Sequence, residues 1–150
     1  MIILDFGSGN TCKNDLNYVK RMIDELKAVD TGKHEVVIKW QLFEWAGDNI
    51  PLEPAVFHAA LHFARRAGYK TTASVFDKQS LIMLLQYDIP FVKIANRPDL
   101  YWLAGEVPRK MPVYLSVPCI FKTEAISKVE GNVIPLLCVS KYPATINDYE

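Results

Sequence analysis

The sequence predicts an α/β fold built on a parallel sheet. Short apolar runs alternate along the chain with segments in which apolar residues recur at helical spacing, as expected when strands and helices follow one another. The strand-like runs are apolar at consecutive positions, which is typical of parallel strands covered on both faces. Two architectures share these features: an open doubly wound sheet, and part of a (β/α)8 barrel.

Six strands are expected along the chain. They cover Ile2–Phe6, Glu35–Leu42, Lys70–Val75, Phe91–Ala95, Val113–Val117 and Val133–Val139. A complete (β/α)8 barrel needs eight strands and typically about 250 residues. Six strands in 150 residues therefore fit either an open sheet or a barrel that stops after its sixth strand.

Segments with apolar residues at helical spacing lie between these strands. An apolar stripe from Leu16 to Leu26 follows a cap near Asn14 or Asp15. A second stripe, from Val56 to Ala67, ends at Gly68, and a third, around Leu81–Leu85, begins at Asp77. Shorter helices are expected at Pro98–Gly105 and Thr123–Glu130.

Composition excludes several classes of protein. Seventeen basic side chains balance seventeen acidic ones, so no net field would attract nucleic acid or an anionic membrane. No apolar stretch approaches the roughly 20 residues that cross a bilayer, and the first residues lack the basic region of a signal peptide. Cys12, Cys119 and Cys138 have no CxxC spacing, which favours a reducing compartment. We expect one cytoplasmic domain.

Polar side chains stand at the carboxyl end of each predicted strand, where parallel α/β folds bind ligands. Lys39 and Lys93 are the most informative, because each is embedded in apolar residues and a buried ammonium is costly unless an anion meets it. They predict either one anionic ligand or acidic partners. The other strand-end residues are Asp5, Gln41, Ser74, Asn96, Ser116, Ser140 and Tyr142. Polar groups at all six ends suit a closed ring of strands.

Short motifs at these strands occur in a recognisable order. Residues 3–7 read ILDFG, 37–41 VIKWQ, 73–77 ASVFD, 89–96 IPFVKIAN, 112–116 PVYLS and 136–143 LLCVSKYP. In that order they resemble the I-A-E-I-G, V-K-x-Q, S-T-P-F-D, I-P-A-Y-K-I-G-S, P-V-I-L-S and L-x-C-x-S-x-Y-P motifs of the N-terminal barrel of the N-acetylneuraminate (sialic acid) synthase family. No single motif is very specific, but six in register span nearly the whole chain.

The resemblance implies a partial (β/α)8 TIM-type barrel and a phosphoenolpyruvate-dependent condensation. The second substrate would be an N-acylated hexosamine of the N-acetylmannosamine type, and the product a nonulosonic acid. Residues at the family's phosphoenolpyruvate contacts are Lys39, Ser74, Lys93 and Ser116. Asn96 matches another ligand position, and Gln41, Ser140 and Tyr142 match residues that line the pocket, partly toward the sugar. Asp5 takes the place of the family's strand-1 Glu and is the catalytic candidate.

The chain also departs from the family. Pro98 stands where the family has a Glu, and Leu137 where a His is common. The resemblance implies a divalent metal, Mn or Mg, but the family's metal ligands, its seventh and eighth strands and its antifreeze-like domain have no counterpart in residues 1–150. We therefore expect open sheet edges covered by self-association or a partner, and weak or no catalysis by the isolated chain. A non-catalytic binding or structural role is the alternative, and the sugar is not specified.

Two further motifs receive structural interpretations. His58 and His62 are spaced four apart without the Glu of H-E-x-x-H, and they stand away from the apolar stripe. They predict a solvated helix face rather than a metal site. Residues 7–10 read GSGN but lack the third glycine of a dinucleotide fingerprint.

Overall fold

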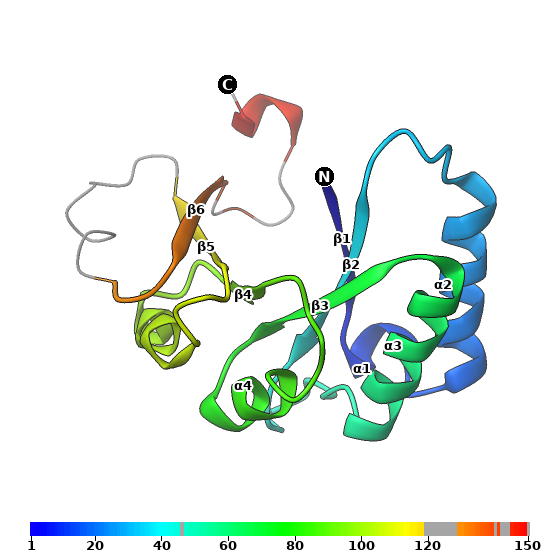
Figure 1. Ribbon diagram of the computed structural model, residues 1–150, viewed down its shortest axis with the longest axis horizontal. Helices are drawn as coiled ribbons and strands as arrows, with labels where there is room; N and C mark the ends of the chain where they lie inside the picture. The colour runs from blue at the N-terminus through cyan, green and yellow to red at the C-terminus, as the bar shows by residue number, and fades with distance from the viewer. Residues whose placement is uncertain (46, 119–128, 140, 142–144, 150) are drawn as a thin grey trace. The chain divides into compact units, whose positions relative to one another are not determined.

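The computed structural model describes residues 1–45, 47–118, 129–139, 141 and 145–149. The chain divides into two compact units, residues 1–90 and 91–150, and each is described by itself. Both contain parallel strands and helices (Figure 1). The predicted fold class, an α/β partial (β/α)8 barrel with six parallel strands, is confirmed.

The first unit contains a three-stranded parallel sheet. Its strands are β1 (Ile2–Gly7), β2 (Val36–Leu42) and β3 (Lys70–Val75), in that order. Asp5 stands opposite Lys39, and Gln41 stands opposite Ser74. Because alternate side chains of a strand share one face, these four leave the sheet on the same side. Ile38, Trp40 and Ala73 occupy the alternating positions and are fully buried.

Four helices accompany this sheet. They are α1 (Gly9–Cys12), α2 (Leu16–Val29), α3 (Pro54–Ala67) and α4 (Lys78–Leu84). The two long helices, α2 and α3, pack side by side (Figure 1). Buried apolar residues recur along α3 at helical spacing, which is the stripe that the sequence predicts.

Local hydrogen bonds explain where the helices begin and end. Asp15 caps α2 by accepting hydrogen bonds from the backbone N–H groups of Asn17 and Tyr18. Gly68 ends α3 in the left-handed region, with φ of 92°, where a side chain would be strained. Asp77 caps α4 by accepting from Ser80 N at 2.7 Å, and it also accepts from Glu44 N at 2.8 Å. This second bond attaches the loop after β2 to the start of α4.

The second unit repeats the parallel arrangement. Its strands are β4 (Val92–Ile94), β5 (Val113–Pro118) and β6 (Val133–Cys138), and β5 pairs with both neighbours. Between β4 and β5 lies the 3-10 helix η1 (Pro98–Glu106), and η3 (Ile146–Tyr149) follows β6. On β6, Ile134 is 37% and Leu137 71% exposed.

All six predicted strands are present, with ends that differ by at most one residue. The segment Pro98–Gly105 is helical as predicted, but it is a 3-10 helix. Its buried residues, Leu100, Tyr101, Leu103 and Ala104, form two pairs three residues apart, which matches the three residues per turn of a 3-10 helix. The predicted helix Thr123–Glu130 lies almost wholly outside the described residues.

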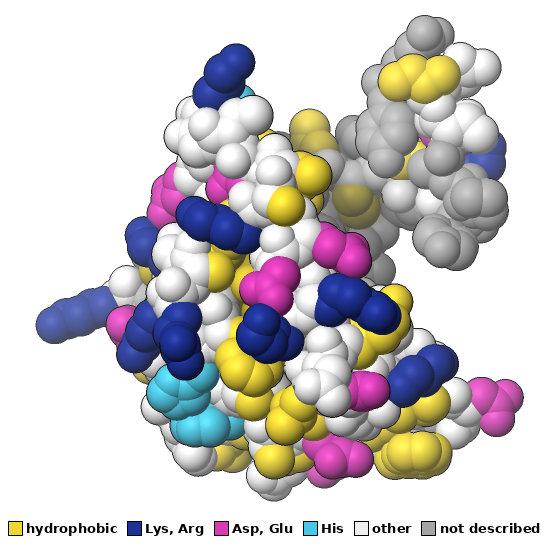
Figure 2. All heavy atoms as spheres, turned by 90° about the vertical axis from the view of Figure 1, so that its right-hand side faces the viewer, with side chains coloured by type: hydrophobic (Ala, Val, Ile, Leu, Met, Phe, Trp, Pro, Cys, Tyr) yellow, Lys and Arg dark blue, Asp and Glu magenta, His cyan; other side chains and the backbone are white. Residues whose placement is uncertain are grey.

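The outer side of the first unit is polar. Figure 2 shows lysine, arginine and acidic side chains interspersed on this face, with adjoining histidines among them. His58 and His62 on α3 are both exposed, with ring centroids 4.7 Å apart, so the predicted solvated face is confirmed. Among the described helices, none combines the length and the hydropathy that crossing a bilayer requires.

Replacing Gly9 by alanine is expected to destabilise the first unit by about 1–3 kcal/mol. A Cβ at this position would lie 2.4 Å from Pro51 O and 2.8 Å from Ile50 O, so backbone must move. Gly105→Ala is the matched control, because its Cβ would meet nothing nearer than 3.5 Å. Urea unfolding measures both, and equal stability of the two variants would contradict the prediction.

Candidate functional site

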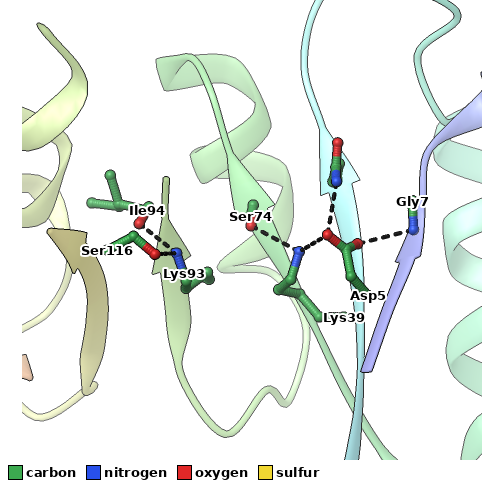
Figure 3. A network of polar contacts seen from close by, with 8 residues as sticks. Asp5, Gly7, Lys39, Ser74, Lys93, Ile94 and Ser116 are labelled. Carbon is green, nitrogen blue, oxygen red and sulfur yellow. Dashed lines mark hydrogen bonds and ion pairs between the residues drawn. The ribbon is translucent and has the colours of Figure 1, made fainter. Parts of the chain in front are cut away.

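A buried lysine organises the carboxyl ends of the strands in the first unit. Lys39 Nζ lies 2.8 Å from Asp5 Oδ2 and donates a hydrogen bond of 3.2 Å to Ser74 Oγ (Figure 3). The lysine side chain is 10% exposed and that of Asp5 is 45% exposed. Of the two alternatives that the sequence leaves open for Lys39, an anionic ligand or an acidic partner, the structure supplies the acidic partner.

Asp5 is held by two further donors. Gln41 Nε2 donates to Oδ2 at 2.8 Å, and the backbone N–H of Gly7 donates to Oδ1 at 3.0 Å. The pairing of β1 with β2 is irregular between Asp5 and Gly7, and Gly7 has φ of 78°. This conformation, which glycine adopts without strain, lets the chain turn back so that its N–H reaches the Asp5 carboxylate.

The pKa values of Asp5 and Lys39 are both lowered, but for different reasons. Burial alone would raise the pKa of the Asp5 carboxyl, but the Lys39 charge and the hydrogen bonds from Lys39, Gly7 and Gln41 hold that pKa below its usual value. For Lys39, burial lowers the pKa of the ammonium, and Asp5 offsets only part of this effect. At neutral pH Asp5 is therefore a carboxylate, which accepts hydrogen bonds and has no proton to give.

The second unit has a lysine at the equivalent place. Lys93 Nζ donates to Ser116 Oγ at 2.7 Å and to Ile94 O at 2.7 Å (Figure 3). Lys93 on β4 is paired with Tyr114 on β5, so Ser116 lies two residues beyond the partner of the lysine. In the first unit Lys39 is paired with Thr72, and Ser74 likewise lies two residues beyond it. Each unit thus builds the same lysine–serine pair with the same register.

These pairs are suited to binding an anion. In each, the serine oxygen accepts from the ammonium, so the serine hydroxyl keeps its own hydrogen for a further acceptor. Within the described residues no acceptor of either hydroxyl is found. An ammonium and a hydroxyl that both donate match the oxygens of a phosphate or a carboxylate.

A tyrosine that the sequence did not single out supports the second pair. Tyr101 Oη lies 3.0 Å from Ser116 O and 3.2 Å from Asn96 Oδ1, so its hydrogen is donated to one of these oxygens or shared between them. Burial, followed by the charge of Cys138, raises the pKa of the Tyr101 hydroxyl, which therefore stays protonated and able to donate. Tyr101 lies on η1, five residues after Asn96, and neither spacing nor composition would have distinguished it.

The structure brings together most of the predicted site residues that it describes. Asp5, Lys39, Gln41 and Ser74 form one hydrogen-bonded cluster in the first unit. In the second unit, Lys93 bonds Ser116, and Tyr101 lies within hydrogen-bond distance of both Ser116 and Asn96. Ser140 and Tyr142, the remaining predicted site residues, lie outside the described residues.

A divalent metal, which the family resemblance implies, does not fit the residues described. Within residues 1–45, 47–118, 129–139, 141 and 145–149, no three His, Cys, Asp or Glu side chains are grouped so as to hold an ion. The one carboxylate of the first cluster, Asp5, already accepts three hydrogen bonds, and an ammonium 2.8 Å away would repel a cation. Asp99, next to Pro98, is instead held by Arg97 at 2.6 and 2.9 Å.

The segment of residues 8–10, which follows β1, has a structural role. Ser8 caps the four-residue helix α1, and Gly9 lies against the backbone of Ile50 and Pro51. The side chain of Asn10 accepts from Ile50 N at 2.7 Å. This segment therefore joins β1 to the loop before α3, and its polar groups serve that contact.

Comparison with solved structures finds close likenesses over nearly the whole chain. N-acetylneuraminic acid (sialic acid) synthetase from Leptospira borgpetersenii, solved in complex with citrate, is 26% identical, with a TM-score of 0.75 over 98% of this chain and 56% of its own. A spore coat polysaccharide biosynthesis protein from Bacillus subtilis is 18% identical, with a TM-score of 0.76 over 97% of this chain and 45% of its own.

A truncated 3-deoxy-D-arabino-heptulosonate 7-phosphate synthase from Thermotoga maritima is more distant. It is 14% identical, with a TM-score of 0.60 over 90% of this chain and 50% of its own. No protein-family model matches the chain, and no characterised protein matches it by sequence. The resemblance to the sialic acid synthases is confirmed, and the chain spans about half the length of these structures.

Replacing Asp5 by asparagine is expected to lower the free energy of unfolding at neutral pH by about 1–2 kcal/mol, a value that allows for solvent screening of this half-exposed carboxylate. Because the pKa of Asp5 is lowered in the folded state, its contribution is present above the ordinary value of 3.8 and is lost as the pH falls through the folded value. The stability difference between wild type and Asp5→Asn should therefore shrink on acidification.

Urea unfolding of both proteins at a series of pH values measures this difference. Asp24→Asn is the control, because it removes a carboxylate from an exposed ion pair, with Lys20 at 2.6 Å, that should stabilise little. If the difference in free energy of unfolding between wild type and Asp5→Asn does not change with pH, the ion pair between Asp5 and Lys39 is contradicted.

Proposed function

We propose that the chain is the phosphoenolpyruvate-binding part of a sialic acid synthase-like enzyme. The reaction would join phosphoenolpyruvate to an N-acylated hexosamine aldehyde, of the N-acetylmannosamine type, to give a nonulosonic acid. Residues 1–150 would correspond to the first six strands of the barrel, working in the cytoplasm. The single observation that carries the proposal is the repeated lysine–serine pair at strand carboxyl ends, Lys39–Ser74 and Lys93–Ser116.

The chemistry of the pairs supports an enol phosphate as ligand. Phosphoenolpyruvate has two anionic groups, a phosphate and a carboxylate, and each lysine–serine pair offers an ammonium and a hydroxyl. Either pair by itself would neutralise one of these anionic groups and orient it, leaving the C3 carbon of the ligand to attack the aldehyde carbon of the sugar. Asn96, held near Tyr101 at 3.2 Å, would add an amide beside the second pair.

Asp5 and Gln41 would face the sugar in this proposal. Asp5 is ionised at neutral pH, so it would accept a hydrogen bond from a sugar hydroxyl or take up a proton, and would not act as the acid. Gln41 bonds Asp5 at 2.8 Å and so fixes the direction of that carboxylate. Ser140 and Tyr142 remain part of the proposal through the resemblance alone. A divalent metal is not assigned, because the described residues do not fit one.

A second candidate is a binding protein without catalysis. It is favoured by the ion pair between Asp5 and Lys39, which engages the catalytic candidate, and by Pro98, which begins η1 where the family has a Glu. Both candidates bind phosphoenolpyruvate. Release of inorganic phosphate in the presence of N-acetylmannosamine separates them, since only the enzyme breaks the C–O bond of the enol phosphate.

Calorimetric titration of phosphoenolpyruvate tests the binding that both candidate functions require. Lys93→Met is expected to weaken binding by about 1.5–3 kcal/mol, the free energy of a hydrogen bond to a charged group. Lys70→Met is the control. Lys70 is 64% exposed, pairs with Glu35, and is the first residue of β3, so it lies away from the carboxyl ends of the strands. If wild type and Lys93→Met bind equally, or if neither binds, the proposed site is wrong.

A further inference from the structure

We propose that Tyr101 is a positioning residue for the Lys93–Ser116 pair of the second unit. The inference rests on the proposed function, since this pair is one of the two assigned there to an anionic group of phosphoenolpyruvate. It adds that the pair depends on a side chain that does not itself bind the ligand. The Tyr101 hydroxyl holds Ser116 in place where the backbone pairing of its strand with β4 has ended.

Backbone pairing between β4 and β5 stops before it reaches Ser116. The last pair joins Ile94 to Leu115, whereas β5 runs on past Ser116. The N–H of Val92 donates to Pro112 O at 3.0 Å, so the carbonyl of Pro112 faces β4. Backbone groups alternate between the two neighbours of a strand, and Ser116 lies an even number of residues after Pro112. The carbonyl of Ser116 therefore faces the same side, just beyond the last residue of β4.

The Tyr101 hydroxyl takes the place of the missing backbone donor. If β4 continued in the same register, the N–H of Asn96 would face the carbonyl of Ser116. Instead, Tyr101 Oη lies 3.0 Å from Ser116 O and 3.2 Å from Asn96 Oδ1. One hydroxyl, supplied from η1, thus joins the segment that follows β4 to the carboxyl end of β5.

Tyr101 acts on an anion only through the groups that it holds. A tyrosine hydroxyl has one hydrogen, and that hydrogen is engaged by Ser116 O, Asn96 Oδ1 or both. Phosphate and carboxylate oxygens need donors, so the tyrosine is not a ligand contact. Its own place is fixed by the packing of η1, in which Tyr101 is 8% exposed and Leu103 and Ala104 are fully buried.

The position of the Ser116 hydroxyl follows from that of its backbone. Ser116 Oγ accepts from Lys93 Nζ at 2.7 Å (Figure 3), and a small displacement of the end of β5 lengthens this contact. Removing the Tyr101 hydroxyl takes away the donor that holds the Ser116 carbonyl. The serine hydroxyl and the lysine ammonium are then less well ordered relative to one another, and ordering them when an anion binds costs affinity.

The test is a double-mutant cycle of wild type, Tyr101→Phe, Ser116→Ala and the double variant, in which calorimetry measures the binding of phosphoenolpyruvate. Tyr101→Phe keeps the ring and removes only the hydroxyl. We expect it to bind about three- to tenfold more weakly than wild type, the scale of one hydrogen bond. In the Ser116→Ala background the same change should cost about twofold or less, because the hydroxyl that Tyr101 positions is gone. A purely structural effect of Tyr101 would be equal in both backgrounds.

Tyr18→Phe is the matched control, because it removes the same hydroxyl from an exposed residue of α2. It should bind phosphoenolpyruvate as wild type does. A second readout needs no ligand and follows the Lys93 Cε and Nζ signals by nuclear magnetic resonance. These signals should shift in Tyr101→Phe, and adding Tyr101→Phe to Ser116→Ala should shift them no further. The native signals come from folded molecules, so this readout holds even if Tyr101→Phe is partly unfolded.

The inference is overturned if Tyr101→Phe binds phosphoenolpyruvate as wild type does, or if it weakens binding equally in the Ser116→Ala background. The proposed function fails separately, if wild type does not bind phosphoenolpyruvate or if Lys93→Met binds it equally well. In that case the Lys93 signals decide the inference. A shift that Ser116→Ala abolishes supports it, whereas no shift, or an equal shift in both backgrounds, overturns it.

Discussion

The structure of the first unit depends on one physical constraint, the presence of a charged lysine in an apolar strand. Lys39 is flanked on β2 by side chains that are wholly buried, and an ammonium there is tolerated only if anionic or polar oxygens reach it. The parallel register supplies both, because it sets Asp5 of β1 opposite the lysine and Ser74 of β3 two residues beyond its partner. The irregularity after Asp5 and the positive φ of Gly7 then serve to hold that carboxylate in place.

The same constraint is met differently in the second unit. Lys93 is also buried, and its ammonium donates to Ser116 and to the carbonyl of the adjacent Ile94. Both units thus use a serine two residues beyond the strand partner of the lysine. Parallel pairing explains the shared part, since side chains two residues apart on neighbouring strands point to the same face.

The sequence predicted the strands and the two buried lysines because both depend on local pattern. Consecutive apolar residues indicate buried parallel strands, and a lysine within such a run indicates a compensated charge. The partner of Lys39 could not be chosen from sequence, because it depends on the register between β1 and β2 and on the turn at Gly7. Tyr101 was missed for a similar reason: its hydroxyl reaches Ser116 O from a 3-10 helix, a long-range contact that the prediction of a helix does not specify.

Asp5, which stands where the resemblance places the family's strand-1 Glu, makes a contact that depends on its shorter side chain. An aspartate at this position bonds the N–H of Gly7 two residues on, a local turn that the longer glutamate does not favour. The shorter side chain therefore ties the carboxylate to its own strand end and, through register, to Lys39. The aspartate is thus held beside the lysine by a local turn, while the strands, the lysine and the serine keep the places that the motifs predict.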